Sequence, residues 1–156
     1  MNNESDRLIR RLRSGEQIPY HLLLLADETI EGIERYIHES EIYVIESEER
    51  LIAVCVLQPI DSSVVEIKNI AVDRDHQGKG IGHSLLFDAI RRAREIGYSE
   101  IIIGTGDIAA RQISLYEDVG FKKYGVKKDF YVLNYPDPIF ENGIRLRDMV
   151  MLKIDI

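Results

Sequence analysis

The sequence has one cysteine, four prolines and no long apolar segment, and each scarcity excludes a class of protein. Cys55 has no partner for a disulfide within the chain, and no charged start followed by an apolar stretch opens the sequence, so we expect a cytoplasmic protein. The longest apolar run falls far short of the roughly 20 residues that a membrane-spanning helix needs, so we expect no membrane partner. Without a Pro-, Gly- or Ser-rich linker, residues 1–156 are predicted to form a single domain.

A positive net charge is also lacking, since 20 Lys and Arg face 27 Asp and Glu, for a net charge of −7. No basic stripe alternates with aromatic residues, so we expect no nucleic-acid partner. Residues 27–49 hold the strongest excess of acidic side chains, with Arg35 as their one basic residue. This segment either creates an acidic side that concentrates cations or consists of ordinary solvated faces.

Patterns for metal binding and thiol chemistry are absent as well. His76 and His83 lack a metal-like constellation of ligands, so we expect surface or loop histidines and no metal site. Cys55 lies in an expected strand without a histidine at a suggestive spacing, so we expect a small buried hydrophobe rather than a nucleophile.

The hydrophobic pattern predicts a mixed α/β (α+β) fold. Alternating β-branched residues at 42–45, 51–57 and 64–72, separated by polar turns, predict an antiparallel meander. Apolar residues at helical spacing from Ile81 to Ala93, ended by Gly97, precede the short apolar run 101–103. This order predicts a parallel βαβ unit attached to the meander.

The remaining segments give weaker local predictions. Residues 8–12 fit a short strand or a helical turn. After Pro19 we expect a short buried helix over 22–25, followed by a helix that is capped by Asp27 or Thr29 and carries Ile30, Ile33 and Ile37. In the second half we expect a helix over 107–119 capped by Asp107, and then a strand from Phe121. A loop over 129–143 and a final strand over 145–154 complete the prediction.

The segment 77–82 places three glycines between a predicted strand and a predicted helix. Free backbone N–H groups and the positive end of the helix would converge there, which predicts an anion cradle; a tight turn that binds nothing is the alternative. Lys79 is followed by Gly80, not by Ser or Thr, so the segment is not a Walker A loop. His83 stands where a dinucleotide fingerprint needs glycine, which excludes that motif too.

Two motifs resemble the GNAT superfamily of acetyl-CoA-dependent N-acetyltransferases. The run 70–72, four intervening residues and Gln77-x-x-Gly80-x-Gly82 resemble its acetyl-CoA signature, and the run 115–121 resembles its closing motif. The order of elements agrees over essentially the whole chain, and residues 124–144 resemble a bacterial subgroup of unassigned substrate. The resemblance implies one N-acetyltransferase domain with a mostly antiparallel sheet of about six or seven strands, a splayed parallel pair at the cofactor site and about four helices on both faces.

The resemblance also implies how acetyl-CoA binds. The backbone of Ile70, Ala71 and Val72 would hold the acetyl carbonyl and the pantetheine amides, and a fixed N–H there would stabilise a developing oxyanion. The loop amides of Gln77, Gly78, Lys79, Gly80, Ile81 and Gly82 would hold the pyrophosphate, with His83 or Ser84 as extra donors. Many members place Asn where this chain has Ala109, so Asp107 or Gln112 is expected to replace its contact with the pantetheine arm.

Two side chains take catalytic roles by the same resemblance. Tyr116 corresponds to the tyrosine that protonates the departing thiolate, and a core aromatic is the alternative. Glu66 lies eleven residues before Gln77, the spacing of the general base in the histone-modifying branch. It is alternatively an exposed strand residue or a substrate anchor.

The acceptor would enter between the first helices and the loop before the last strand. The residues of these segments that suit a cationic amine are acidic or aromatic: Asp27, Glu28, Glu31, Glu34, Asp129, Tyr131, Tyr135, Asp137, Phe140 and Glu141. We therefore expect direct transfer, within a ternary complex, to a primary amine of a small molecule. A protein or peptide amine and a non-catalytic acetyl-CoA-binding or sensing module are the alternatives, and the family suggests a homodimer.

Overall fold

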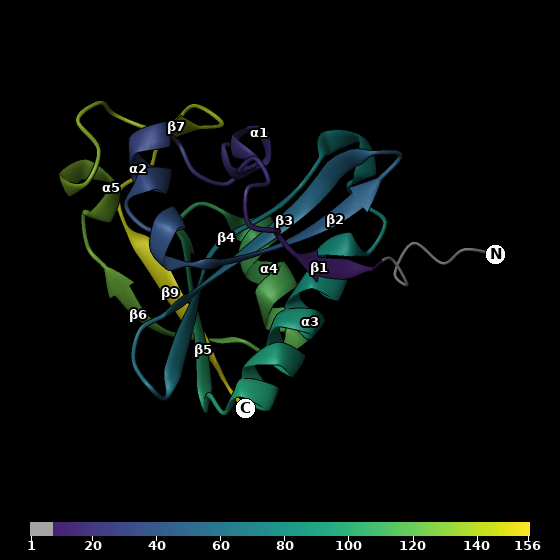
Figure 1. Ribbon diagram of the computed structural model, residues 1–156. Helices are drawn as coiled ribbons and strands as arrows, with labels where there is room; N and C mark the ends of the chain where they lie inside the picture. The colour runs from purple at the N-terminus through teal and green to yellow at the C-terminus, as the bar shows by residue number, and fades with distance from the viewer. Residues whose placement is uncertain (1–7) are drawn as a thin grey trace.

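The computed structural model describes residues 8–156, which form a seven-stranded sheet with helices on both faces (Figure 1). The strands are β1 (Ile9–Arg11), β2 (Glu41–Ser47), β3 (Arg50–Pro59), β4 (Val64–Val72), β5 (Glu100–Gly106), β6 (Lys122–Lys127), β7 (Phe140–Glu141), β8 (Ile144–Arg145) and β9 (Met149–Asp155). The order in the main sheet is β1-β2-β3-β4-β5-β9-β6, and β7 and β8 form a separate two-stranded sheet.

The helices cover the two faces of the sheet in separate groups. They are α1 (Tyr20–Leu23), α2 (Ile30–Glu34), α3 (Ile81–Ile96), α4 (Ala110–Val119) and α5 (Phe130–Leu133), with the 3-10 helices η2 (Ile37–Glu39) and η3 (Arg74–His76). One core joins α3 and α4 to inward-facing residues such as Cys55 and Ile67, and the other joins α1, α2 and η2 to residues such as Val56 and Ala71. The predicted mixed fold with helices on both faces is confirmed.

The parallel pair in the sheet consists of β4 and β5, connected through α3. Their pairing runs from Val64 opposite Glu100 to Ile67 opposite Ile103 and stops there. Because β4 continues to Val72 and β5 to Gly106, the two strands separate over their second halves. The predicted parallel βαβ unit with a splayed strand pair is confirmed.

Strand β4 contains one extra residue relative to β3. Asn69 pairs with Val56 and Ile67 pairs with Leu57, so Lys68 is the bulged residue. A bulge of this kind breaks the strict alternation of side chains and bends the strand away from its neighbour. It therefore lies where β4 begins to leave β5.

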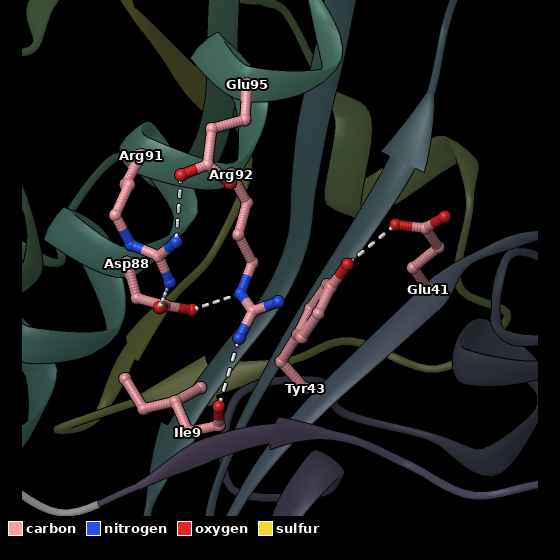
Figure 2. Close-up of polar contacts among 7 residues, drawn as sticks. All are labelled: Ile9, Glu41, Tyr43, Asp88, Arg91, Arg92 and Glu95. Atoms are coloured by element: carbon pink, nitrogen blue, oxygen red, sulfur yellow. Dashed lines mark hydrogen bonds and ion pairs between the residues drawn. The ribbon is translucent and has the colours of Figure 1, made fainter.

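Arg92 holds α3 against the first two strands (Figure 2). Its guanidinium donates to Asp88 over 2.7 Å and to the carbonyl oxygen of Ile9 in β1 over 3.0 Å. The same group lies 4.4 Å from the ring centre of Tyr43 in β2, whose hydroxyl donates to Glu41 over 2.8 Å. Arg92 thus ties the helix to β1 and β2 and fixes the sheet edge on that side.

Two of the early local predictions hold and one is corrected. Residues 9–11 form a strand, and Thr29 caps α2 by accepting a hydrogen bond from the Gly32 N–H over 2.9 Å. The helix does not reach Ile37, which lies in η2, because Tyr36 leaves the helical conformation at φ −129°.

Three predictions in the second half need correction. Asp107 does not cap α4, because Ala109 is the N-cap and no side chain caps that helix. The Asp107 N–H instead donates to the backbone carbonyl of Asp148. The segment 129–143 is not simply a loop, since it forms α5 and β7. The final strand begins at Met149 rather than Arg145, because Arg145 pairs with Phe140.

Candidate active site

A cavity of about 1000 Å³ opens where β4 and β5 separate and extends from the start of α3 to the segment after β6. Most residues implicated by the motifs line it: Glu66, Ile70, Ala71, Val72, Gln77, Gly78, Gly80, Ile81, Gly82, His83, Gln112 and Tyr116. Lys79, Ser84 and Asp107 do not line it, and Asp107 is exposed to solvent. The structure therefore brings Gln112, and not Asp107, to the cavity.

The glycine loop forms an open cradle at the N-terminus of α3. Gly78 and Gly80 adopt positive φ angles of 75° and 81°, and a Cβ on either would meet no atom of the chain within 4 Å. The first intrahelical hydrogen bond runs from the Ser84 N–H to the Gly80 carbonyl, and no side chain caps the helix. The N–H groups of Ile81, Gly82 and His83 thus have no acceptor within the helix, and these three residues line the cavity. Such N–H groups and the helix dipole suit an anion such as a pyrophosphate.

The separated half of β4 directs backbone groups into the same cavity. The Asp73 N–H donates to the Ile52 carbonyl of β3 over 2.7 Å. In an antiparallel pair the backbone alternates its direction, so Ala71 also faces β3, whereas Ile70 and Val72 point toward the gap beside β5. The carbonyl of Val72 receives a hydrogen bond from the Gln77 side chain over 3.0 Å, which joins the glycine loop to this edge.

Tyr116 lies on α4 with only 5% of its surface exposed, and it lines the cavity. Its ring centre is 6.2 Å from that of Phe121, which lies directly before β6. Burial, followed by the field of Cys55, raises the pKa of the Tyr116 phenol above its ordinary value. The phenol is therefore protonated at neutral pH and can act as a proton donor.

Glu66 is a buried carboxylate in the wall of the cavity, with 7% of its surface exposed. Its Oε2 lies 3.5 Å from Nζ of Lys68, whose ammonium is also 5.5 Å from the ring centre of Tyr36. Burial at this position excludes the alternative of an exposed strand residue. A carboxylate that faces a cavity can accept a proton or anchor a cation.

Asp27 joins the loop between α1 and α2 to the segment that contains α5, which Figure 1 shows beside α2. Tyr135 donates to Asp27 Oδ1 over 2.9 Å, and Tyr36 donates to Asp27 Oδ2 over 3.2 Å. The ring of Tyr131 stacks on that of Tyr135 at 6.0 Å between centres. Tyr131, Tyr135 and Tyr36 thus form an aromatic cluster around the carboxylate of Asp27.

Acidic side chains gather at this end of the cavity. Asp27, Glu28 and Glu141 line it together with Tyr131 and Tyr135. Burial raises the pKa of Glu28, and the negative charges of Glu141 and Asp27 raise it further. The other acceptor residues suggested by the sequence do not line the cavity: Glu31, Glu34, Asp129, Asp137 and Phe140.

A positive charge accompanies these carboxylates. Arg35 lines the cavity, lies 5.5 Å from the ring centre of Tyr135 and donates to the Asn134 carbonyl over 2.6 Å. The acidic end therefore has a net excess of carboxylates over cationic groups and a fixed arginine at its edge.

Several residues of the cavity were not predicted to belong to the site. Asn69 and Tyr36 are buried and hydrogen-bonded to each other over 3.1 Å. The available signal for Asn69 was that it is one of three polar residues, with Glu66 and Lys68, in a predicted strand that is otherwise apolar. Arg111 and Leu146 line the cavity as well, and no pattern in the sequence marks them.

Within residues 8–156 no group of three or more His, Cys, Asp or Glu side chains is placed to hold a metal ion. No helix in this range has the length and apolar character needed to cross a membrane. Cys55 is buried in β3, and burial raises the pKa of its thiol to about 12. The thiol is thus protonated and inaccessible, as a core residue would be.

Comparison with known proteins places this architecture in a family. Residues 8–121 match the model of the acetyltransferase (GNAT) family. The chain is 40% identical over 149 residues to the "Uncharacterized N-acetyltransferase YvbK" of Bacillus subtilis (strain 168), covering 94% of this chain and 96% of the relative.

Solved structures agree with this match. A GNAT family acetyltransferase from Elizabethkingia anophelis with acetyl-CoA bound superimposes with a TM-score of 0.93 at 40% identity, over 100% of both chains. An acetyltransferase from Bacillus subtilis in complex with CoA gives a TM-score of 0.85 at 39% identity, over 97% of this chain and 99% of the other. The chain therefore belongs to the GNAT family, and it is an acetyl-CoA-dependent N-acetyltransferase.

Proposed function

We propose that the cavity transfers an acetyl group directly from acetyl-CoA to a primary amine of a small cationic molecule, with both substrates bound together. The observation that carries this proposal is the continuity of one cavity from the glycine cradle to the acidic and aromatic end. An anionic donor and a cationic acceptor would thus be held at opposite ends, with Glu66 and Tyr116 among the residues between them.

On the donor side the chain supplies backbone groups rather than charged side chains. The loop amides from Gln77 to Gly82 would bind the pyrophosphate, supported by His83 and by Lys79 and Ser84 just outside the lining. The backbone of Ile70 and Val72 would bind the pantetheine arm, with Gln112 as a further donor, and the N–H of Ile70 would face the acetyl oxygen. The backbone of Ala71, which was expected to contribute as well, faces β3 instead. Acetyl-CoA supplies an activated thioester, and this N–H would stabilise the negative charge that develops on its oxygen by a few kcal/mol.

The protons follow a balanced path through two side chains. An amine with a pKa of about 10 is mostly protonated at neutral pH, so a base is needed to release its lone pair. Glu66 would take this proton directly or through a water molecule. The neutral amine nitrogen then forms the C–N bond as the C–S bond breaks, and Tyr116 gives its proton to the departing sulfur. The acylated nitrogen releases its second proton to water, the Tyr116 phenolate takes a proton back from water, and Glu66 returns its proton to solvent. The net products are the amide, the thiol and one proton.

The acceptor class follows from the acidic end. Asp27, Glu28 and Glu141 supply negative charge, and Tyr131 and Tyr135 supply aromatic faces that favour a cation. Because Glu28 and Glu141 repel each other, a bound cation would relieve that repulsion. A second ammonium or guanidinium group on the acceptor would fit this environment better than a neutral chain.

A panel assay tests the proposal. Thiol release from acetyl-CoA would be followed with polyamines, aminoglycosides, amino acids and lysine-containing peptides, using the native protein and Glu66→Gln. We expect turnover with a cationic small molecule and its loss in Glu66→Gln. Turnover with peptides alone would reject the small-molecule acceptor, and full activity of Glu66→Gln would reject the base.

The proposal includes a homodimer in the cytoplasm. Strand β6 forms one edge of the main sheet, and its side chains Tyr124 and Val126 are exposed. An edge strand of this kind has backbone groups that can pair with another chain. Light scattering that gives the mass of one chain at micromolar concentration would contradict the dimer.

A further inference from the structure

Asn69 is a buried polar residue for which the reaction described above assigns no role. It lies on β4 directly before Ile70, has 4% of its surface exposed and lines the cavity. It faces the core of α1, α2 and η2, since its pairing partner Val56 belongs to that core. This is the side on which Asp27 and Tyr36 meet.

The amide of Asn69 is fixed in one orientation. Its Nδ2 donates to the carbonyl oxygen of Leu23 over 2.9 Å and to the hydroxyl of Tyr36 over 3.1 Å. A backbone carbonyl can only accept, so the NH₂ group must face Leu23 and the oxygen must face the other way. Both N–H groups are thereby used within the chain.

The oxygen of the same amide is left without a donor. Among the described residues, Asn69 Oδ1 is a buried atom with no hydrogen-bond partner. An unmet buried acceptor is costly, and native proteins keep few of them. The cost is removed if a ligand brings an N–H or O–H group to this oxygen.

The surroundings of Asn69 hold the oxygen in place. Tyr36, which accepts from Asn69, donates in turn to Asp27, and Asp27 accepts from Tyr135. A chain of hydrogen bonds thus connects the amide to the acidic end of the cavity. Glu66 lies on the same face of β4, because the bulge at Lys68 restores that alignment.

We propose that Asn69 Oδ1 binds the acceptor nitrogen by receiving one of its N–H groups beside the acetyl carbon. The inference rests on the proposed function. Acetyl and thioester atoms carry no donor, and the pantetheine amides are expected along the backbone edge of Ile70 and Val72, so the amine supplies the missing N–H. As the C–N bond forms, positive charge grows on the nitrogen and this hydrogen bond strengthens, which favours the transition state over the bound substrate.

Two matched probes test the proposal without turnover. Each is CoA with a CH₂–CO group on its sulfur, joined either to NH–(CH₂)₄–NH₃⁺ or to O–(CH₂)₄–NH₃⁺. Both place the acceptor chain in the cavity through the affinity of CoA, but only the amide probe has an N–H at the acceptor position. Calorimetric Kd values of both probes and of CoA itself would be measured for the native protein, Asn69→Leu and the smaller change Asn69→Ser.

We expect the native protein to bind the amide probe about ten-fold more tightly than the ester probe, and both variants to bind the two probes equally. Asn134→Leu is the control, since Asn134 also lines the cavity but its amide donates to the Phe130 carbonyl over 2.8 Å. That variant should keep the native preference.

The opposite results have separate meanings. Equal binding of both probes by the native protein, or a preference that survives in Asn69→Leu and Asn69→Ser, would overturn the role of Asn69. A weaker Kd for CoA itself in these variants would assign Asn69 to the donor instead. Failure of the native protein to bind CoA would reject the proposed function and not merely this inference.

Discussion

Glu66 and Asn69 lie on the same face of β4 although they are three residues apart in the sequence. Strict strand alternation would place them on opposite faces, and the extra residue Lys68 reverses that outcome. Both side chains line one cavity, together with Tyr116 from α4. The proposed base and the proposed amine-binding oxygen thus share a wall because the strand is bulged.

Tyr116→Phe tests the proton donor. Burial keeps the phenol protonated, and removing a general acid costs about 10²-fold or more in rate, so kcat should fall by that order while the Kd of acetyl-CoA stays constant. Tyr98→Phe is the control, because Tyr98 packs against the same core as Tyr116 but does not line the cavity. Native kcat in Tyr116→Phe would rule out the role.

Gly80→Asp tests the anion cradle, with Gly97→Asp as its partner. Both glycines adopt positive φ, at 81° and 109°, and both have open space around a new Cβ, but they lie at opposite ends of α3. Each substitution should cost about 1 kcal/mol of stability. Only Gly80→Asp should weaken acetyl-CoA binding, by about ten-fold or more, because it adds negative charge where the pyrophosphate is expected. Equal Kd values for the two variants would contradict the cradle.

The pH dependence of acceptor binding tests the acidic end. Burial, then Glu141 and Asp27, raise the pKa of Glu28, so this carboxylate gains its proton at a higher pH than an exposed glutamate. The KM of a cationic amine should therefore rise as the pH falls through that raised pKa. Glu28→Gln should show a KM roughly two- to five-fold higher at neutral pH and less dependent on pH.

Glu31→Gln is the matched control for this profile, because Glu31 is exposed on α2 and does not line the cavity. It should reproduce the native curve. If Glu28→Gln also showed the native pH dependence of KM, the cationic group would not bind beside Glu28.

Stability at low pH tests a structural ion pair near the first strand. Glu16 accepts two hydrogen bonds from Arg10, each of 2.9 Å, and one from the Arg13 N–H, and its pKa falls from 4.5 to about 2. A lowered folded-state pKa adds stability that is complete above the unfolded pKa and is lost as the pH falls toward the folded one.

Thermal unfolding of the native protein and Glu16→Gln measures this contribution. The native protein should be more stable by about 1 kcal/mol near neutral pH, and the difference should disappear as the pH falls from about 4.5 to about 2. A difference that persists at the acidic end would show that Glu16 acts through packing rather than charge.

The sequence predicted the parts of the fold that depend on local patterns. Alternation in β2, β3 and β4, the apolar stripe of α3 and the glycine that ends it were sufficient for those elements and for the parallel unit with β5. The two motifs pointed to the glycine loop and to Tyr116, because glycine positions and residue spacing can be read directly from the sequence. Local patterns failed at 129–149, where a short helix and a hairpin are held by tertiary contacts such as Arg145 opposite Phe140.

The details of the acceptor end depend on contacts that no local pattern specifies. Asp27 accepts a hydrogen bond from Tyr135, which lies more than a hundred residues away in the sequence. The side-chain amide of Asn69 is oriented by its hydrogen bond to the Leu23 carbonyl. The bulge at Lys68 is a register effect between two strands. Such features follow from tertiary packing. The sequence therefore predicted which segments supply acidic and aromatic side chains, but it did not predict which of these side chains line the cavity.

Two-substrate kinetics test the central claim most directly. Initial rates of thiol release and of acetylated amine would be measured over a grid of acetyl-CoA and of the amine that the panel identifies. Direct transfer with both substrates bound predicts intersecting double-reciprocal lines, one acetylated amine for each thiol released and unchanged rates in Cys55→Ala. Parallel lines, with an acetyl group trapped on the protein before the amine is added, would contradict the account.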